Sequence, residues 1–182
     1  MKLLKNRGFA VLVLVIVIAA SIALAWMRTG NTSDHLMPET GTASGYELDD
    51  LPTAAYTTWI SDGAGVLSNS TEEAVCLYNA NWDNRYHSLV ALATVNGVSG
   101  DLADYAYELG NEIGLGSGDA ILVLDIGGQD AYLATGDDFR TMLTDSMATQ
   151  YLDTYLYSDF MAGNYDQGVL ALYNGLNTLY VD

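Results

Sequence analysis

The stretch that decides the fold is "SGDLADYAYELGNEIGLGSGDAILVLDIGGQDAYLATG", residues 99–136. "DAILVLDI" is almost entirely apolar, which is typical of a strand buried on both faces. Gly127 and Gly128 then predict a tight turn into "DAYLATG", an antiparallel neighbour. The first half of the stretch predicts a helix that ends at Gly114 and has one apolar stripe, formed by Leu102, Tyr105, Ala106, Leu109 and Ile113.

Working outward, "HSLVALATVNG" (residues 87–97) predicts a second buried strand, and "YTTWI" (residues 56–60) predicts an edge strand. A strand–helix–strand unit requires a right-handed crossover, and helices should cover both faces of the sheet. The sequence therefore predicts an α/β fold, a three-layer α/β/α sandwich with a small mixed sheet, over residues 51–182.

Further helices complete these layers. Ser70 and Glu73 form a capping-box pattern that predicts the start of a first helix. A long helix is expected from about Thr141 to Phe160. A last helix is expected from near Asn164, and its predicted buried residues are Val169, Leu172, Tyr173, Leu176 and Tyr180.

The N-terminal residues 1–28 resemble a signal-anchor. Residues 8–26 carry no charge and, as a helix, would reach roughly 28 Å, the hydrocarbon thickness of a bilayer. Lys2, Lys5 and Arg7 precede this segment, so the positive-inside rule places the N-terminus in the cytoplasm and the rest outside. We expect a single-pass cell-membrane protein that contacts the lipid bilayer through residues 8–26. The alternative is secretion after signal cleavage near Ala25.

Charge and composition exclude several classes of protein. Residues 29–50 are a polar, Gly/Ser/Thr-rich linker. Residues 29–182 contain all 23 acidic residues but only two arginines, Arg85 and Arg140. Such a surface repels nucleic acid and suits either solubility or hard cations. Cys76 is the only cysteine, so neither an intrachain disulfide nor a cysteine zinc site is possible.

Carboxylates at the ends of elements are the remaining candidates for a site. If the strands of the opening stretch are antiparallel, the start of one lies beside the end of the other. This arrangement would gather Asp119, Asp137, Asp138 and Asp145 at one rim. Four converging carboxylates repel each other unless a cation or protons intervene, which is the arrangement of a Ca²⁺ or Mg²⁺ site. The alternative is a rim of solvated turn and cap residues.

The order of motifs resembles the TPM domain family. "ISDGAGVLSNS" (residues 60–70) is similar to its opening motif and "ATGDDFRTMLTD" (residues 134–145) to its Thr-Gly segment, while "FMAGNYDQGVLAL" (residues 160–172) is similar to its closing signature. The similarity runs in order from about residue 56 to 180. It implies a three-layer α/β/α domain that is exported and membrane-tethered. It also implies Ca²⁺ binding in some relatives and weak acid phosphatase activity in one.

The sequence departs from the family pattern in the Thr-Gly segment. Asp138 and Arg140 stand where the family has its second glycine and its glutamate, and Asp137 is a further variation of this chain, whereas Asp62, Asp145 and Asp166 match the family. Three functions are compatible with these residues. The first is an anchored module that binds a divalent cation and an envelope protein partner. The second is a weak metal-assisted acid phosphatase, and the third is a metal-free envelope scaffold.

Overall fold

The computed structural model describes residues 46–180. The predicted membrane segment, residues 8–26, and the first part of the linker lie outside these described residues. Between Tyr46 and Tyr180, no helix has the length and apolar character needed to cross a bilayer.

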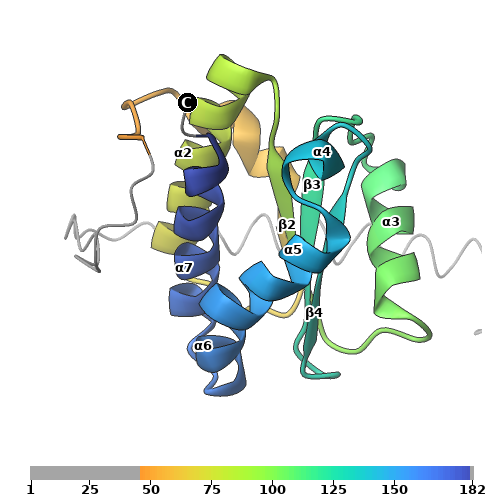
Figure 1. The fold of residues 1–182 in the computed structure, drawn as a ribbon. Helices are drawn as coiled ribbons and strands as arrows, with labels where there is room; N and C mark the ends of the chain where they lie inside the picture. The colour runs from red at the N-terminus through yellow and green to blue at the C-terminus, as the bar shows by residue number, and fades with distance from the viewer. Residues whose placement is uncertain (1–45, 181–182) are drawn as a thin grey trace, which may run out of the picture. The chain divides into compact units, whose positions relative to one another are not determined.

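The centre of the fold is a four-stranded mixed sheet (Figure 1). Its strands lie in the order β1-β2-β3-β4; the first three run parallel and β4 is antiparallel to β3. The α/β fold and the antiparallel pair are confirmed. The strands are β1 (Ile60–Asp62), β2 (Val90–Val95), β3 (Ala120–Asp125) and β4 (Asp130–Thr135).

The predicted edge strand over residues 56–60 is wrong. Ala54–Trp59 forms a 3₁₀-helix, η1, and the edge strand begins at Ile60. The hydroxyls of Thr57 and Thr58 each donate to the carbonyl oxygen three residues earlier. These local bonds offer the backbone an alternative to the ladder and favour the helical turn.

Helices surround the sheet on both faces. Within residues 46–180 they are α2 (Asn69–Tyr86), α3 (Leu102–Glu112), α4 (Phe139–Met142), α5 (Asp145–Tyr151), η2 (Leu152–Leu156, a π-helix), α6 (Tyr157–Met161), α7 (Tyr165–Asn177) and η3 (Thr178–Tyr180). Side chains of α3 form one hydrophobic core with the sheet, and those of α2, α5, η2, α6 and α7 form the other. The sheet is therefore the middle layer between two helical layers.

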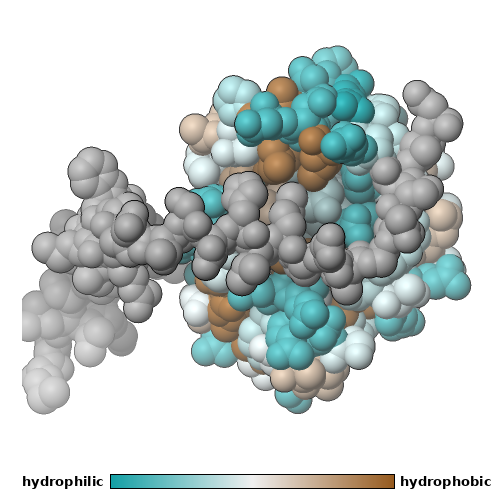
Figure 2. Space-filling model, turned by 90° about the vertical axis from the view of Figure 1, so that its left-hand side faces the viewer, coloured by the Kyte–Doolittle hydropathy of each residue, from teal (hydrophilic) through white to brown (hydrophobic). Residues whose placement is uncertain are grey.

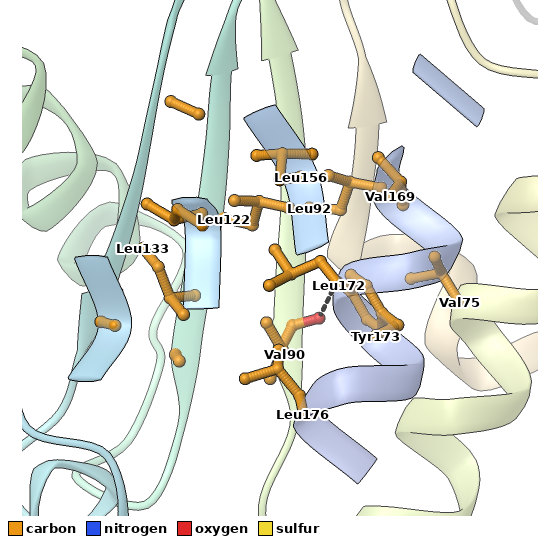
Figure 3. Close-up of a cluster of buried hydrophobic side chains, with 14 of the residues drawn as sticks. Val75, Val90, Leu92, Leu122, Leu133, Leu156, Val169, Leu172, Tyr173 and Leu176 are labelled. Carbon is orange, nitrogen blue, oxygen red and sulfur yellow. Dashed lines mark hydrogen bonds between the residues drawn. The ribbon is translucent and has the colours of Figure 1, made fainter. Parts of the chain in front are cut away.

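The larger core lies between the sheet and α7 (Figure 3). Leu172 and Leu176 point from α7 toward the side chains of β2 and β3. Tyr173 is fully buried among them, and its hydroxyl donates a 2.8 Å hydrogen bond to the carbonyl oxygen of Val90. The last predicted helix and its buried face are thus confirmed.

Two helix starts differ from the prediction. The N-cap of α2 is Ser68 rather than Ser70, and its hydroxyl accepts from the amide of Thr71. The predicted helix from about Thr141 is divided: α4 ends at Met142, and α5 begins at Asp145 after the N-cap Thr144. The new N-cap bond satisfies an amide that would otherwise lack a partner, so the helix restarts there.

The described fold begins before Leu51. The guanidinium of Arg85 lies 4.0 Å from the centre of the Tyr46 ring and donates a 2.6 Å bond to the carboxylate of Asp49. The side chain of Asn81 also accepts from the amide of Asp49 and donates to its carbonyl oxygen. The end of the predicted linker is therefore attached to α2.

Candidate functional site

The predicted acidic residues lie at the end of the sheet where β3 begins and β4 ends. Ala120 pairs with Thr135. Asp119, just before β3, therefore lies opposite the segment Gly136–Asp138, just after β4. The start of β3 thus lies beside the end of β4, as expected, and the amide of Gly136 donates a 2.8 Å hydrogen bond to the carbonyl oxygen of Asp119. Asp145 is the first residue of α5 and approaches the same segment through Arg140.

Asp119 holds the connection between α3 and β3. One carboxylate oxygen accepts from the amide of Leu89 at 3.0 Å, and the other accepts from the amide of Gly116 at 2.7 Å. Both oxygens therefore have backbone partners. Asp119 therefore stabilises the loop between α3 and β3 through these hydrogen bonds.

Asp138 is attached to the same connection. Its carboxylate accepts from the hydroxyl of Ser117, while its amide donates to the carbonyl oxygen of Ser117 at 2.9 Å. This contact requires a glycine at position 136, because a Cβ there would overlap the carbonyl oxygens of Gly116 and Ser117. Glycine thus allows the turn after β4 to approach the residues before β3.

Arg140 gathers the other two acidic residues. Its guanidinium lies 3.2 Å from the carboxylate of Asp137 and 3.1 Å from that of Asp145. It also donates to the hydroxyl of Tyr107 in α3 and to the carbonyl oxygen of Thr135. Arg140 therefore offsets the acidic residues of the rim, and it joins α4 to α3 and to the end of β4.

A half-buried tyrosine pair lies beside Arg140. The rings of Tyr107 and Tyr132 meet edge to face, with centroids 6.0 Å apart. Burial, followed by the neighbouring Tyr107 hydroxyl, raises the pKa of Tyr132 to about 12. The Tyr132 hydroxyl is therefore neutral at physiological pH, and the Tyr107 hydroxyl accepts a hydrogen bond from the guanidinium of Arg140.

The four predicted metal ligands thus form two pairs. Asp119 and Asp138 are bonded to the Gly116–Ser117 connection, and Asp137 and Asp145 are bonded to Arg140. Throughout residues 46–180, no three or more His, Cys, Asp or Glu side chains are grouped in a way that could hold a metal ion.

A pocket of about 70 Å³ lies beside these residues, between α3 and the β3–β4 pair. Its walls are mostly apolar and include Ala106, Ile121 and Ala134. Asn111 and Asp119 contribute polar groups to the lining. The pocket was not predicted from the sequence, because it depends on how α3 packs against the sheet.

The opposite end of the sheet carries a further structural carboxylate. Asp125 ends β3 and is buried; its oxygens accept from the amides of Gly97, Val98 and Gly128. Burial alone would raise the pKa of Asp125, but these backbone hydrogen bonds outweigh it and lower the pKa. Sequence reasoning missed this residue, although the Gly-Gly turn after it was a signal.

The family-like residues Asp62 and Asp166 anchor loops. The carboxylate of Asp62 accepts from the amides of Val66 and Leu67 and from the hydroxyl of Thr94. Asp166 accepts from the amide of Ser68 at 2.8 Å and from its hydroxyl at 3.0 Å. These bonds join β1, β2, α2 and α7 at one junction.

Glu72 lies close to that junction. Burial raises the pKa of Glu72, and the negative charges of Asp62 and Asp166 raise it further. The junction is therefore acidic as well as densely hydrogen-bonded.

Comparison with known proteins agrees with this architecture. The family model described as the TPM domain matches residues 60–179. No curated protein is similar enough to count as a relative. The solution structure of the N-terminal domain of a Porphyromonas protein (P. gingivalis) is similar, with 23% identity, a TM-score of 0.62, and coverage of 74% of this chain and 90% of that one.

Two other solution structures share the fold. The N-terminal domain of a Corynebacterium glutamicum protein is 15% identical, with a TM-score of 0.56 and coverage of 72% of this chain and 85% of that one. A protein of the psychrophilic bacterium Bizionia argentinensis is 12% identical, with a TM-score of 0.51 and coverage of 62% and 81%, respectively. At these identities, the likeness concerns the fold alone.

Proposed function

Because the chain belongs to the TPM domain family, we propose that it is a membrane-anchored extracytoplasmic module that binds a divalent cation and acts through an envelope protein partner. The uncharged segment at residues 8–26 supports an anchor in the cell membrane. The basic residues before it support a cytoplasmic N-terminus. Signal cleavage near Ala25 would release the same domain outside the cell.

The observation that carries the cation proposal is the position of Ser117 beside Asp138. The hydroxyl and the carboxylate are in direct contact, and the neighbouring side chain of Asp137 is 91% exposed. Calcium prefers carboxylate, hydroxyl and carbonyl oxygens and completes its shell with water. Two carboxylates and a hydroxyl would make a weak site, with a Kd on the order of 10⁻⁴–10⁻³ M as in other extracellular modules.

Charge supports the same proposal. Within residues 46–180, Arg85 and Arg140 are the only lysine or arginine residues, so the acidic residues of the domain attract cations. Figure 2 shows the face on the side of α2 and α7, where hydrophilic residues cover large areas around small hydrophobic groups.

Calorimetric titration of the full-length chain, purified in a mild detergent, tests the cation proposal. We expect Ca²⁺ at millimolar concentration to release or absorb heat and to raise the Tm. Asp138→Asn should weaken the binding, whereas the exposed control Glu73→Gln should leave it unchanged. No heat and no shift in Tm with either Ca²⁺ or Mg²⁺ would leave the metal-free scaffold.

The same preparation tests the phosphatase alternative. A metal-assisted acid phosphatase would hydrolyse p-nitrophenyl phosphate at acid or neutral pH, and Asp145→Asn would slow it. Asp145 is paired with Arg140 in this structure, so we expect no hydrolysis above background. Hydrolysis that depends on Asp145 would show that the domain is an enzyme and not an interaction module.

A further inference from the structure

The pocket between α3 and the β3–β4 pair contains free space that the packing of the helix does not require. Gly110 lines it from the interior of α3, where glycine destabilises a helix by roughly 1 kcal/mol relative to alanine. A Cβ at Gly110 would lie 3.4 Å from Ile121 and 3.5 Å from Leu115, which is ordinary contact. Alanine would therefore fit, and the glycine instead leaves an apolar space open.

The surroundings of the pocket are acidic. Asp104 and Glu108 are exposed on α3, three residues before the lining residues Tyr107 and Asn111 and therefore adjacent to them on the helix surface. Asp119 belongs to the lining itself. On the far side, the lining residue Gly136 is followed by two more aspartates, and the cation beside them, Arg140, is shared between Asp137 and Asp145.

The acidic residues of α3 repel one another. Asp104 and Glu108 are four residues apart, as are Glu108 and Glu112, and like charges at this spacing destabilise a helix. The last turn of α3 contains no basic residue to offset them. A positively charged partner would relieve this repulsion when it binds.

We propose that this pocket receives one apolar side chain of a partner protein segment whose flanking residues are lysine or arginine. The apolar walls suit the branched end of a leucine or valine side chain. Charge complementarity selects the basic flanks and disfavours acidic segments and nucleic acid. The inference rests on the proposed interaction module and identifies the chemistry of its partner.

Photo-crosslinking of the full-length chain tests the pocket. The probe is the peptide Lys-Lys-photoleucine-Lys-Lys, blocked at both ends, whose photoreactive group occupies the apolar position. Mass spectrometry should map its crosslinks to residues 106–116 and 134–136. Excess unlabelled Lys-Lys-Leu-Lys-Lys should suppress them, whereas Lys-Lys-Ser-Lys-Lys and Glu-Glu-Leu-Glu-Glu should not.

Variants test the apolar pocket and its acidic surroundings separately. Gly110→Ala and the larger Gly110→Leu should reduce the crosslinks severalfold by filling the pocket while the Tm shows that the protein is folded. Glu108→Lys should also reduce them, whereas the charge-matched control Glu73→Lys on α2 should not. Crosslinks spread over the surface and unchanged by Gly110→Ala would overturn the inference. Because Ca²⁺ titration is a separate measurement, a retained Ca²⁺ response would show that the cation proposal survives that failure.

Discussion

The carboxylate of Asp166, in the first turn of α7, accepts hydrogen bonds from both the amide and the hydroxyl of Ser68, which precedes it by 98 residues. Ser68 is in turn the N-cap of α2. The two residues belong to the opening and closing motifs that resemble the TPM family. Their contact explains in physical terms why two distant motifs occur together: each completes the hydrogen bonding of the other.

Substitutions at Ser68 and Asp166 should therefore be coupled. We expect Ser68→Ala and Asp166→Asn each to lower the free energy of unfolding by about 1 kcal/mol, since each removes an N-cap or a charged acceptor. The double variant should lose less free energy of unfolding than the two single variants together, by at least about 0.5 kcal/mol. Urea denaturation measures this cycle. Simple additivity would show that the contact does not stabilise the domain, and Glu73→Gln serves as an additive control.

The second prediction concerns the buried acceptor at the end of β3. Asp125→Asn replaces one acceptor oxygen with a donor facing the amides of Gly97, Val98 and Gly128. We expect a loss of about 1–3 kcal/mol in the free energy of unfolding. Glu73→Gln, exposed on α2, should change it by less than about 0.5 kcal/mol. Equal stability of the two variants would contradict the role assigned to Asp125.

The third prediction follows from the lowered pKa values of Asp125 and Asp166, which burial opposes and hydrogen bonds bring about. A carboxyl group whose pKa is lower in the folded state contributes stability above its unfolded pKa of about 3.9 and loses it as the pH falls through the folded pKa. The Tm of the wild type should therefore decline below pH about 4. In Asp125→Asn the decline should be shallower, and parallel curves would contradict the assignment.

Arg140 provides a fourth prediction. Arg140→Gln removes the cation that Asp137 and Asp145 share, so a divalent ion at the rim would meet less repulsion. We expect the affinity for Ca²⁺ to rise roughly two- to fivefold, as for the loss of one exposed ion pair. Arg85→Gln, at the other arginine, should leave that affinity unchanged. A weaker response to Ca²⁺ in Arg140→Gln would place the ion elsewhere.

Two glycines provide a fifth, paired prediction. Gly136→Ala forces a Cβ against the carbonyl oxygens of Gly116 and Ser117 and should destabilise the domain by about 1–3 kcal/mol. Gly110→Ala finds room in α3 and should stabilise it by about 0.5–1 kcal/mol. Thermal melting of the two variants distinguishes the glycine required by packing from the one that leaves the pocket open.

The strands and the last helix were predictable because their signals are local. Val90–Val95 and Ala120–Asp125 are almost uninterrupted apolar runs, and Gly127-Gly128 marks the turn between β3 and β4. The edge strand was misplaced because the hydroxyls of Thr57 and Thr58, just before Ile60, donate to carbonyl oxygens three residues earlier and so favour a helical turn. Apolar content alone does not register such bonds.

The details of the site depend on contacts between distant residues. Antiparallel pairing was sufficient to place the start of β3 beside the end of β4, as expected. The division of the acidic residues into two pairs depends on Ser117 and Arg140, whose partners lie in different elements. Similarly, Ser68 rather than Ser70 caps α2 because Asp166 reaches it from the far end of the chain.

The attachment of Tyr46 and Asp49 to α2 has a mechanical consequence. Tension applied to the domain through the residues that precede Tyr46 would first act on the Arg85 stacking contact and on the hydrogen bond from Asn177 to the carbonyl oxygen of Tyr46, and then on the paired Asn81 hydrogen bonds. These few contacts can break one at a time, whereas an applied force on the sheet is distributed over all the hydrogen bonds between neighbouring strands. The attachment would therefore absorb small displacements of a tether before any pull reached the sheet.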